Sequence, residues 1–319
     1  MKLSMLSRTV LERFPVRKTE QQKERFRDWL CGELEGFRFG PRLEHSGSRI
    51  KSCNVVVGDP ERAELLLTAH YDTAPVLPFS NLIFPRDPAA LVLYQVFVLV
   101  LMLAFGLCIE LALLLVWHDA PQWLAVGSVF AGMGLCLWWM LFGRANRHNA
   151  NDNTSGVLTL LETLQLLSPA DKKRVCIVFF DNEEKGLLGS RAFAKAHPGA
   201  ARTKLVLNFD CVGEGTYLHL FPNKPLKAEE QLLSRLEEAF RGREDRTVHV
   251  CRDFGLYPSD QCSFVRGVGV CALKKKRLVG YYIGKLHTGQ DRTLEEENLM
   301  LLREGIMAYL KQTAEERQK

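Results

Sequence analysis

The chain has 319 residues, enough for one large α/β domain or two ordinary domains with a sizeable core. Its formal net charge of +5 comes from lysines and arginines scattered along the sequence, and this pattern argues against nucleic-acid binding. The nine cysteines form no C-x-x-C pair, and the first residues turn polar before an apolar core of signal-peptide length develops. We therefore expect neither a disulfide framework nor a cleavable secretory signal.

The N-terminal part of the chain predicts a helix followed by two strands. Thr19 begins a capping-box pattern, and apolar residues then recur at helical spacing, so an amphipathic helix is expected at about 19–35. Two β-rich runs follow at 53–57 and 63–69, separated by turn residues. The second run leads directly into His70, so this histidine is expected at the end of a strand.

Two long apolar stretches interrupt this pattern. Residues 89–115 hold a single charged side chain, that of Glu110, and residues 123–142 hold none. Each stretch is long enough to cross a hydrocarbon layer of about 30 Å as a helix. With the short link between them, they predict an inserted transmembrane helical hairpin over 75–147. A helical hairpin buried in a large soluble core is the alternative.

Side chains within the second stretch and at Glu110 bear on how the hairpin packs. Small residues would let the second span approach another helix closely, most simply the first span: Gly127, Ser128, Ala131, Gly132 and Gly134. Glu110 either ends the first span, extends toward the interface or serves as a functional intramembrane carboxylate.

After the hairpin, helices and strands alternate. Strands are expected at 174–180, 204–210, 217–221, 247–251 and 268–273, and helices at 155–167, 185–196, 228–240 and 295–311. This order predicts an α/β fold with a mostly parallel central sheet flanked by helices. Residues 1–74 and 148–319 are then expected to form one discontinuous domain.

Imidazole and carboxylate side chains lie at the ends of these predicted elements. His70 and Asp72 follow one strand, Glu183 and Glu184 follow another, Asp210 ends a third, and Asp152 precedes a helix, while His287 lies near the C-terminus. Sites in open α/β sheets gather at the carboxyl ends of the strands. These ligand types suit zinc, and a shared carboxylate can hold two cations close together.

Five segments of the sequence resemble the co-catalytic zinc aminopeptidases of metallopeptidase family twenty-eight. They are TAHYDT (68–73), NDNTSG (151–156), FDNEEKGLLGS (180–190), NFD (208–210) and HTGQD (287–291). The resemblance covers roughly 50–315 apart from the hairpin, which replaces a short connection. It implies the three-layer sandwich of zinc exopeptidases.

The resemblance also implies how the side chains divide between two zinc ions. Asp152 would bridge both ions, His70 and Asp210 would complete one site, and Glu184 and His287 would complete the other. Cobalt or manganese can occupy such oxygen-rich sites as well, so the sequence does not identify the native metal.

The resemblance also implies roles for two residues that are not metal ligands, and the sequence departs from the family pattern at a third residue. Glu183 would act as general base, taking a proton from water and delivering it to the leaving amine. Asp72 would accept the second N–H of His70 and fix the tautomer of the ring. Gln261 follows the Ser259-Asp260 pair where many family members have histidine, and this departure leaves the substrate contacts in doubt.

The flanks of the hairpin predict its orientation. Arg86, Arg144 and Arg147 lie on the domain side, whereas the connecting loop carries Asp119 and no lysine or arginine. By the positive-inside rule, we expect an integral membrane protein with two spans and a cytoplasmic catalytic domain.

The function expected from these features is a membrane-anchored aminopeptidase with two zinc ions, acting on peptides at the bilayer. A carboxypeptidase, an amidase or a glutaminyl-cyclase-like enzyme on the same scaffold is the alternative within enzymes. A catalytically inactive membrane scaffold or receptor is the alternative outside them, although no ligand and no base is lost. Two spans without buried charge argue against a transporter or channel. The oligomeric state is left open.

Overall fold

A ten-stranded sheet forms the centre of the computed structural model, which describes residues 4–47, 50–277 and 279–318. The strands are β1 (Pro41–Ser46), β2 (Ser52–Val57), β3 (Leu65–His70), β4 (Asn81–Ile83), β5 (Val175–Phe180), β6 (Leu205–Phe209), β7 (Tyr217–Pro222), β8 (Thr247–Val250), β9 (Gly267–Lys276) and β10 (Gly280–Leu286). Their order is β1-β2-β5-β3-β6-β9-β10-β4, and β7 pairs with both β8 and β9. Strands from both sides of the hairpin therefore build one sheet.

The four central strands β5, β3, β6 and β9 run parallel, and the pairs on both flanks of this centre are antiparallel, apart from β7 with β8. All strands expected from the sequence are present, with ends shifted by a few residues. The strands β1, β4 and β10 were not predicted. Among them, β1 has only exposed and half-buried residues and β4 has only three residues, so neither carries a strong apolar signal.

Nine α-helices accompany the sheet in the described part of the chain. They are α1 (Met5–Arg13), α2 (Glu20–Gly36), α3 (Pro88–Val116), α4 (Gln122–Phe142), α5 (Ser155–Leu166), α6 (Leu188–Ala196), α7 (Pro198–Thr203), α8 (Glu230–Ala239) and α9 (Glu296–Gln318). The start of α2 is as predicted, because Thr19 and Gln22 form a reciprocal capping box. The helix predicted from residue 185 begins later, at Leu188, because Gly186 and Leu187 have positive φ angles.

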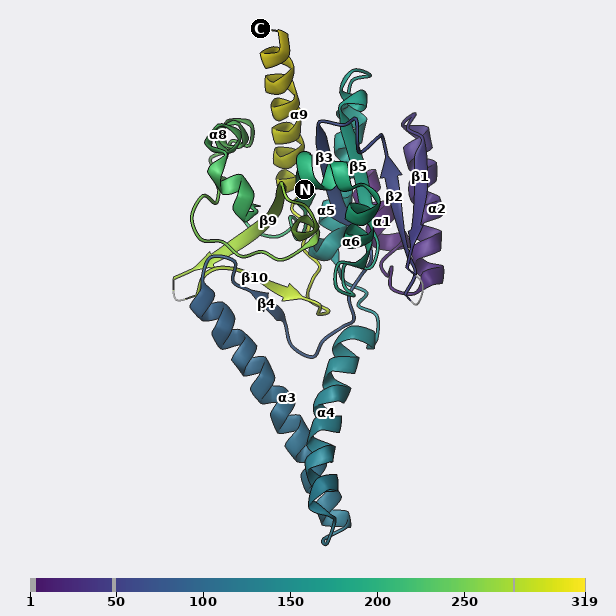
Figure 1. The fold of residues 1–319 in the computed structure, drawn as a ribbon, viewed down its shortest axis with the longest axis vertical. Helices are drawn as coiled ribbons and strands as arrows, with labels where there is room; N and C mark the ends of the chain where they lie inside the picture. The colour runs from purple at the N-terminus through teal and green to yellow at the C-terminus, as the bar shows by residue number, and fades with distance from the viewer. Residues whose placement is uncertain (1–3, 48–49, 278, 319) are drawn as a thin grey trace.

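Alternate residues of the sheet bury against two different helical layers. In β3, Leu65 and Leu67 join a core that includes α5, α8 and α9, whereas Leu66 joins a core that includes Phe193 of α6 and Ala200 of α7. This alternation follows from the period of two in a strand. The result is the predicted three-layer α/β sandwich (Figure 1).

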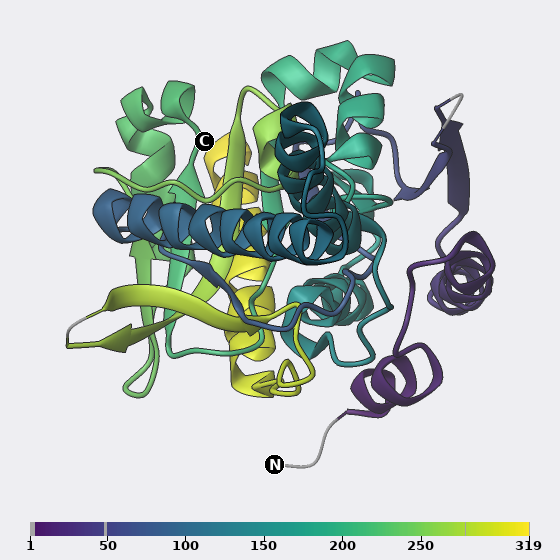
Figure 2. The ribbon, with the colours of Figure 1, turned by 90° about the horizontal axis from the view of Figure 1, so that it is seen from below.

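The helices α3 and α4 project from this sandwich and meet toward their far ends, so that they form a V (Figure 1). Both are long and apolar enough to cross a membrane, and only 11% of the most apolar stretch of each is buried. Figure 2, viewed from the tip of the V, shows the two helices diverging toward the domain. The low burial argues against the alternative of a hairpin inside a soluble core.

Two glycines set the closest approach of α3 and α4. A Cβ atom added at Gly132 would lie 2.8 Å from Cα of Gly106, and one added at Gly106 would lie 2.6 Å from the carbonyl oxygen of Val129. The prediction that small residues pack the second span against the first holds for Gly132. Gly127 and Gly134 have open space around them instead.

Residues 75–87, which we call the strap, connect the sheet to α3 and cross the mouth of the V (Figure 1). The strap contains β4, which pairs with β10 at the register Ile83 to Ile283 and Asn81 to Leu286. Because the hairpin leaves the domain after β3 and returns just before α5, its base lies at the carboxyl edge of the parallel strands. That edge is the one where ligands bind in open α/β sheets.

Candidate metal centre

Five side chains from separate parts of the sequence meet at this carboxyl edge. His70 ends β3, Asp210 follows β6, Asp152 lies in the irregular turn before α5, Glu184 follows β5, and His287 follows β10. The structure thus brings together the five residues that the sequence analysis proposed as metal ligands. Three groups of three contain nearby ligand atoms suited to a cation, and two of these groups share Asp152: His70 with Asp152 and Asp210, and His287 with Asp152 and Glu184.

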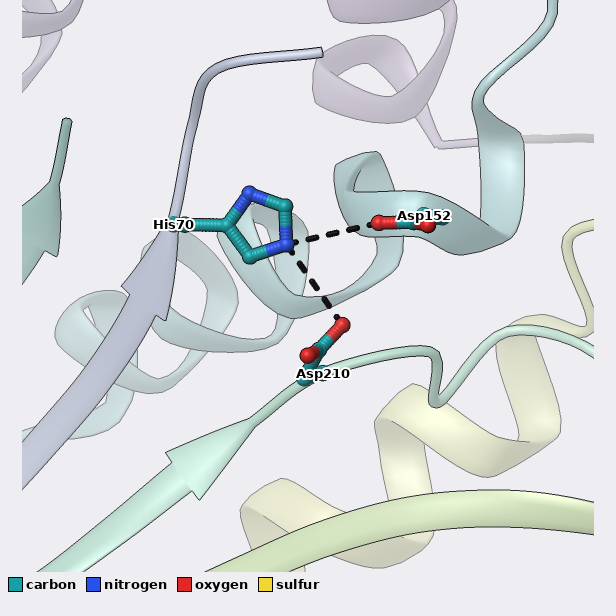
Figure 3. A group of neighbouring side chains, drawn as sticks. All are labelled: His70, Asp152 and Asp210. Atoms are coloured by element: carbon teal, nitrogen blue, oxygen red, sulfur yellow. Dashed lines mark ion pairs between the residues drawn. The ribbon is translucent and has the colours of Figure 1, made fainter. Parts of the chain in front are cut away.

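Asp152 lies between the two histidines and turns one oxygen toward each. Its Oδ1 is 3.3 Å from Nε2 of His70, and its Oδ2 is 3.1 Å from Nε2 of His287. On the first side, Oδ1 of Asp210 is 3.5 Å from Nε2 of His70 (Figure 3). On the second side, Oε2 of Glu184 is 3.4 Å from Nε2 of His287. A carboxylate in this position can serve two neighbouring cations.

Unpartnered oxygens indicate that the residues fit such cations. Within the described part of the chain, Oδ1 of Asp210 and Oε1 of Glu184 are buried and accept no hydrogen bond. Burying a carboxylate oxygen without a donor is costly, so a positive charge placed beside it stabilises the fold. Imidazole and carboxylate together are also the ligand set that zinc prefers.

The pKa shifts of the two histidines also indicate that the site favours positive charge. Burial by itself lowers the pKa of His70, but Asp152, Asp210 and Asp72 outweigh burial and hold that pKa well above its ordinary value. For His287, Glu184 and Asp152 likewise outweigh burial and raise the pKa. Carboxylates surrounding a buried site favour positive charge at its centre, whether this charge is a proton or a metal ion.

Glu183 lines the same small cavity, of about 130 Å³, as Asp152, Glu184, Asp210 and His287. Burial raises the pKa of Glu183 well above its ordinary value, and the neighbouring carboxylates of Glu184 and Asp260 add to the shift. A raised pKa suits a group that must accept and return a proton near neutral pH. Glu183 also lies within reach of His70 and Glu184 as a third possible ligand group, so the distances alone do not separate a base from a ligand.

Asp72 connects His70 to the turn that carries the two glutamates. Its carboxylate accepts hydrogen bonds from the backbone N–H groups of Glu183 (3.0 Å) and Glu184 (3.3 Å). Its Oδ1 is 3.5 Å from Nδ1 of His70, whereas the backbone oxygen of Asp72 is 3.2 Å from the same nitrogen. The nearer partner of the ring is therefore the backbone carbonyl, and the carboxylate mainly fixes the turn.

Asp291 holds the backbone of Asp152, a role that the sequence analysis did not assign. It is 2% exposed, and its Oδ1 and Oδ2 accept hydrogen bonds from the backbone N–H groups of Asn151 (2.8 Å) and Asp152 (3.0 Å). Its place four residues after His287, in the HTGQD segment, is the only signal in the sequence. Ser259 acts similarly on Asp210, since its hydroxyl donates to Oδ2 at 2.6 Å and leaves Oδ1 facing His70.

Gln261, which departs from the family pattern, lies behind the site. Its side chain is 1% exposed, accepts a hydrogen bond from Asn208 at 3.1 Å and donates to the carbonyl oxygen of Tyr257. The cavity wall next to it is formed by Tyr257 and Pro258 instead.

Gly156 supports the site from the other side, because an added Cβ atom would lie 2.2 Å from the carbonyl oxygen of Phe209. Glycine at this position therefore allows α5 to pack closely against β6.

Comparison with models of known protein families finds a match. The model of peptidase family M28 matches residues 140–300, just over half of the chain. Among curated proteins, no sequence matches.

Solved structures share the fold at low sequence identity. Porphyromonas gingivalis glutaminyl cyclase is 17% identical, with a TM-score of 0.59 over 96% of this chain and 97% of that one. A Zn-dependent exopeptidase from Parabacteroides distasonis is 16% identical, with a TM-score of 0.59 and coverage of 96% of both chains. The Legionella pneumophila LapA aminopeptidase is 16% identical, with a TM-score of 0.57 over 97% of this chain and 71% of that one.

Proposed function

Because the chain belongs to peptidase family M28, we propose that it is a membrane-anchored metallo-exopeptidase that binds two zinc ions and removes N-terminal residues from peptides. The observation that carries the proposal is the position of Asp152, with one oxygen toward His70 and the other toward His287. The aminopeptidase among the solved structures of the same fold supports the choice of peptide bond.

In this proposal the five clustered side chains hold the ions. His70 and Asp210 would bind one zinc, Glu184 and His287 would bind the other, and Asp152 would contribute one oxygen to each. When bound, zinc would polarise the scissile carbonyl group and acidify a water molecule. Ser259 and Asp291 act through other residues, because they keep Asp210 and Asp152 in position.

Glu183 is proposed as the general base. Its side chain lines the same cavity as His287 and carries a raised pKa, so it can take the proton of the attacking water and return it to the leaving amine. Asp72 holds the backbone of Glu183 and thereby limits the positions that this carboxylate can reach.

The membrane anchor is the pair α3 and α4. Arg86, Arg144 and Arg147 flank it on the domain side, while the connecting loop carries Asp119, so the catalytic domain is proposed to lie in the cytoplasm. Labelling of an introduced cysteine near residue 119 from the cytoplasmic side would contradict this orientation.

Replacement of Glu183 by Gln tests the enzymatic part. The protein, purified in detergent with zinc, is assayed on a panel of peptides with free and blocked N-termini. We expect Glu183→Gln to lower hydrolysis of free peptides by about 100-fold or more while zinc content is retained. The exposed Glu24→Gln substitution in α2 is the control. Undiminished hydrolysis by Glu183→Gln, or equal cleavage of blocked peptides by the unmodified enzyme, would contradict the proposal.

The panel also includes a peptide with N-terminal glutamine, because glutaminyl cyclases share the fold. A cyclase releases ammonia from this peptide and cleaves no peptide bond. Ammonia release without hydrolysis of any other peptide would identify the cyclase alternative.

A further inference from the structure

An apolar cavity lies between the splayed helices and the strap. It has a volume of about 370 Å³ and is lined by Leu77 and Phe79 of the strap, Met102 and Phe105 of α3, and Leu135 and Trp139 of α4, among others. No charged side chain of the described residues lines it. A cavity of this size and composition can bury several apolar groups of a ligand.

The contact between Gly106 and Gly132 closes the cavity toward the tip of the V. Phe105 directly precedes Gly106, and the lining residues of α4 follow Gly132 in the direction of the domain. The helices therefore pack tightly on one side of the cavity and diverge on the other (Figure 1). The cavity thus opens within the apolar part of the hairpin, on the side next to the catalytic domain.

The strap forms a common wall between this cavity and the metal centre. Leu77 lines the apolar cavity, and its backbone N–H donates to the carbonyl oxygen of His287 at 2.7 Å. Further along the strap, Asn81 and Ile83 line the catalytic cavity beside His287. One segment of about seven residues therefore lines both the apolar cavity and the catalytic cavity. A peptide that extends out of the apolar cavity along the strap would reach the catalytic cavity next.

Two backbone carbonyl groups of the strap accept hydrogen bonds from the helices. The hydroxyl of Tyr94 donates to the carbonyl oxygen of Ser80 at 2.8 Å, and Nε1 of Trp139 donates to that of Val76 at 3.4 Å. These contacts attach the strap to both α3 and α4. They also leave the occupant of the cavity few polar groups to bind, so an apolar occupant is favoured.

We propose that this cavity binds the apolar segment of a membrane-inserted peptide whose free N-terminus reaches the metal centre past the strap. The inference rests on the proposed function and names its substrate class: apolar peptides held in the bilayer with their N-termini at the domain side. The location favours them, because a peptide dissolved in water would have to enter a cavity bounded by lipid-facing helices.

Two matched substitutions on α4 test the inference. Leu135 lines the cavity and Leu137 does not, although the two are similarly exposed, at 54% and 52%. In proteoliposomes, kcat/KM is measured for a leucine-rich membrane-spanning peptide and for soluble aminoacyl anilides. Leu135→Trp fills the cavity. We expect it to lower the ratio of kcat/KM for the membrane-spanning peptide to kcat/KM for the soluble anilides by about tenfold or more, because one leucine-sized side chain of the peptide is then no longer buried. Leu137→Trp should leave the ratio as it is.

Crosslinking separates this inference from the catalytic proposal. A photo-crosslinking amino acid replaces Leu135 or Leu137 in the Glu183→Gln protein, and the membrane-spanning peptide is added in vesicles of phosphatidylcholine. A crosslink at position 135 that clearly exceeds the one at position 137 supports the inference, even if the unmodified protein hydrolyses neither substrate and the proposed function fails.

Equal crosslinking at both positions, or an unchanged ratio in Leu135→Trp, would overturn the inference. Either result would mean that the cavity does not hold the peptide and is left to another apolar occupant, such as a lipid acyl chain. Hydrolysis of the soluble anilides alone by the unmodified protein would overturn it as well and leave the catalytic proposal standing.

Discussion

Replacing Asp291 by Asn should weaken zinc binding although Asp291 is not among the proposed ligands. Its two oxygens accept hydrogen bonds from two buried backbone N–H groups, those of Asn151 and Asp152. Asparagine keeps one acceptor and turns an NH₂ group toward the other N–H. Burial raises the pKa of Asp291 to about 7, so above that pH the lost hydrogen bond involves a charged acceptor and is worth about 1.5–3 kcal/mol. The backbone of Asp152 then loses its fixed position, and zinc affinity should fall by about 10- to 100-fold.

Competition with a chromophoric chelator measures this affinity in detergent-purified protein. Asp119→Asn, in the exposed loop between α3 and α4, is the matched control. It makes the same chemical change at a side chain that is 94% exposed and that lies at the tip of the hairpin, away from the ligands. Zinc affinity of Asp291→Asn within a factor of about two of the unmodified protein would refute the reasoning, because residues that hold metal ligands in place by hydrogen bonds normally change the affinity more than that.

Two further predictions concern stability. Lys23 is 1% exposed and its Nζ lies 2.7 Å from Oδ1 of Asp181, so Lys23→Met leaves a buried carboxylate unpaired and should lower the free energy of unfolding by about 3–5 kcal/mol. Adding Asp181→Asn should restore part of this loss in urea denaturation, and a Lys23→Met protein as stable as the unmodified one would contradict the account. Burial of His219, with His249 and Arg86 nearby, lowers its pKa from 6.5 to about 3. The unfolded chain therefore binds the proton more readily, and stability should fall as the pH drops below 6.5, by about 1.4 kcal/mol per unit. His219→Phe should show a smaller loss between about pH 6.5 and pH 5, and an identical loss would mean that other groups cause it.

The sequence predicted those parts of the fold whose signals are local. The capping box at Thr19 marks the start of α2, and the charge-free stretch 123–142 coincides with α4 but for one residue. The sheet was predicted from apolar runs such as 174–180, because a fully buried parallel strand needs apolar residues on both faces.

Features that depend on contacts between distant segments could not be predicted in the same way. The three residues of β4 form a strand only because β10 lies beside them, and no pattern in the sequence of the strap indicates this pairing. Likewise, Asp291 acts on Asp152, 139 residues away in the chain, and the contact exists only once α5 and the C-terminal segment have packed.

In the candidate site, likewise, the residues could be predicted from the sequence but the detailed geometry could not. The residue types and their positions at strand ends were enough to select the five clustered side chains. Few types of side chain bind zinc, and ligand sites in open α/β sheets lie at the carboxyl ends of the strands. The separate orientation of the two oxygens of Asp152 depends on the turn before α5, whose φ and ψ angles depart from the helix. The sequence does not encode such a geometry in a recognisable local pattern.

The number of zinc ions bound to each chain tests the central claim most directly. Mass spectrometry of the detergent-purified protein under non-denaturing conditions should show two zinc ions in the unmodified chain. Asp210→Asn removes a ligand from one side only, so it should lower the count to one, whereas Asp152→Asn should lose both ions or hold them far more weakly. A single zinc ion in the unmodified chain, or two ions retained with undiminished affinity after Asp152→Asn, would contradict the account of a bridged pair.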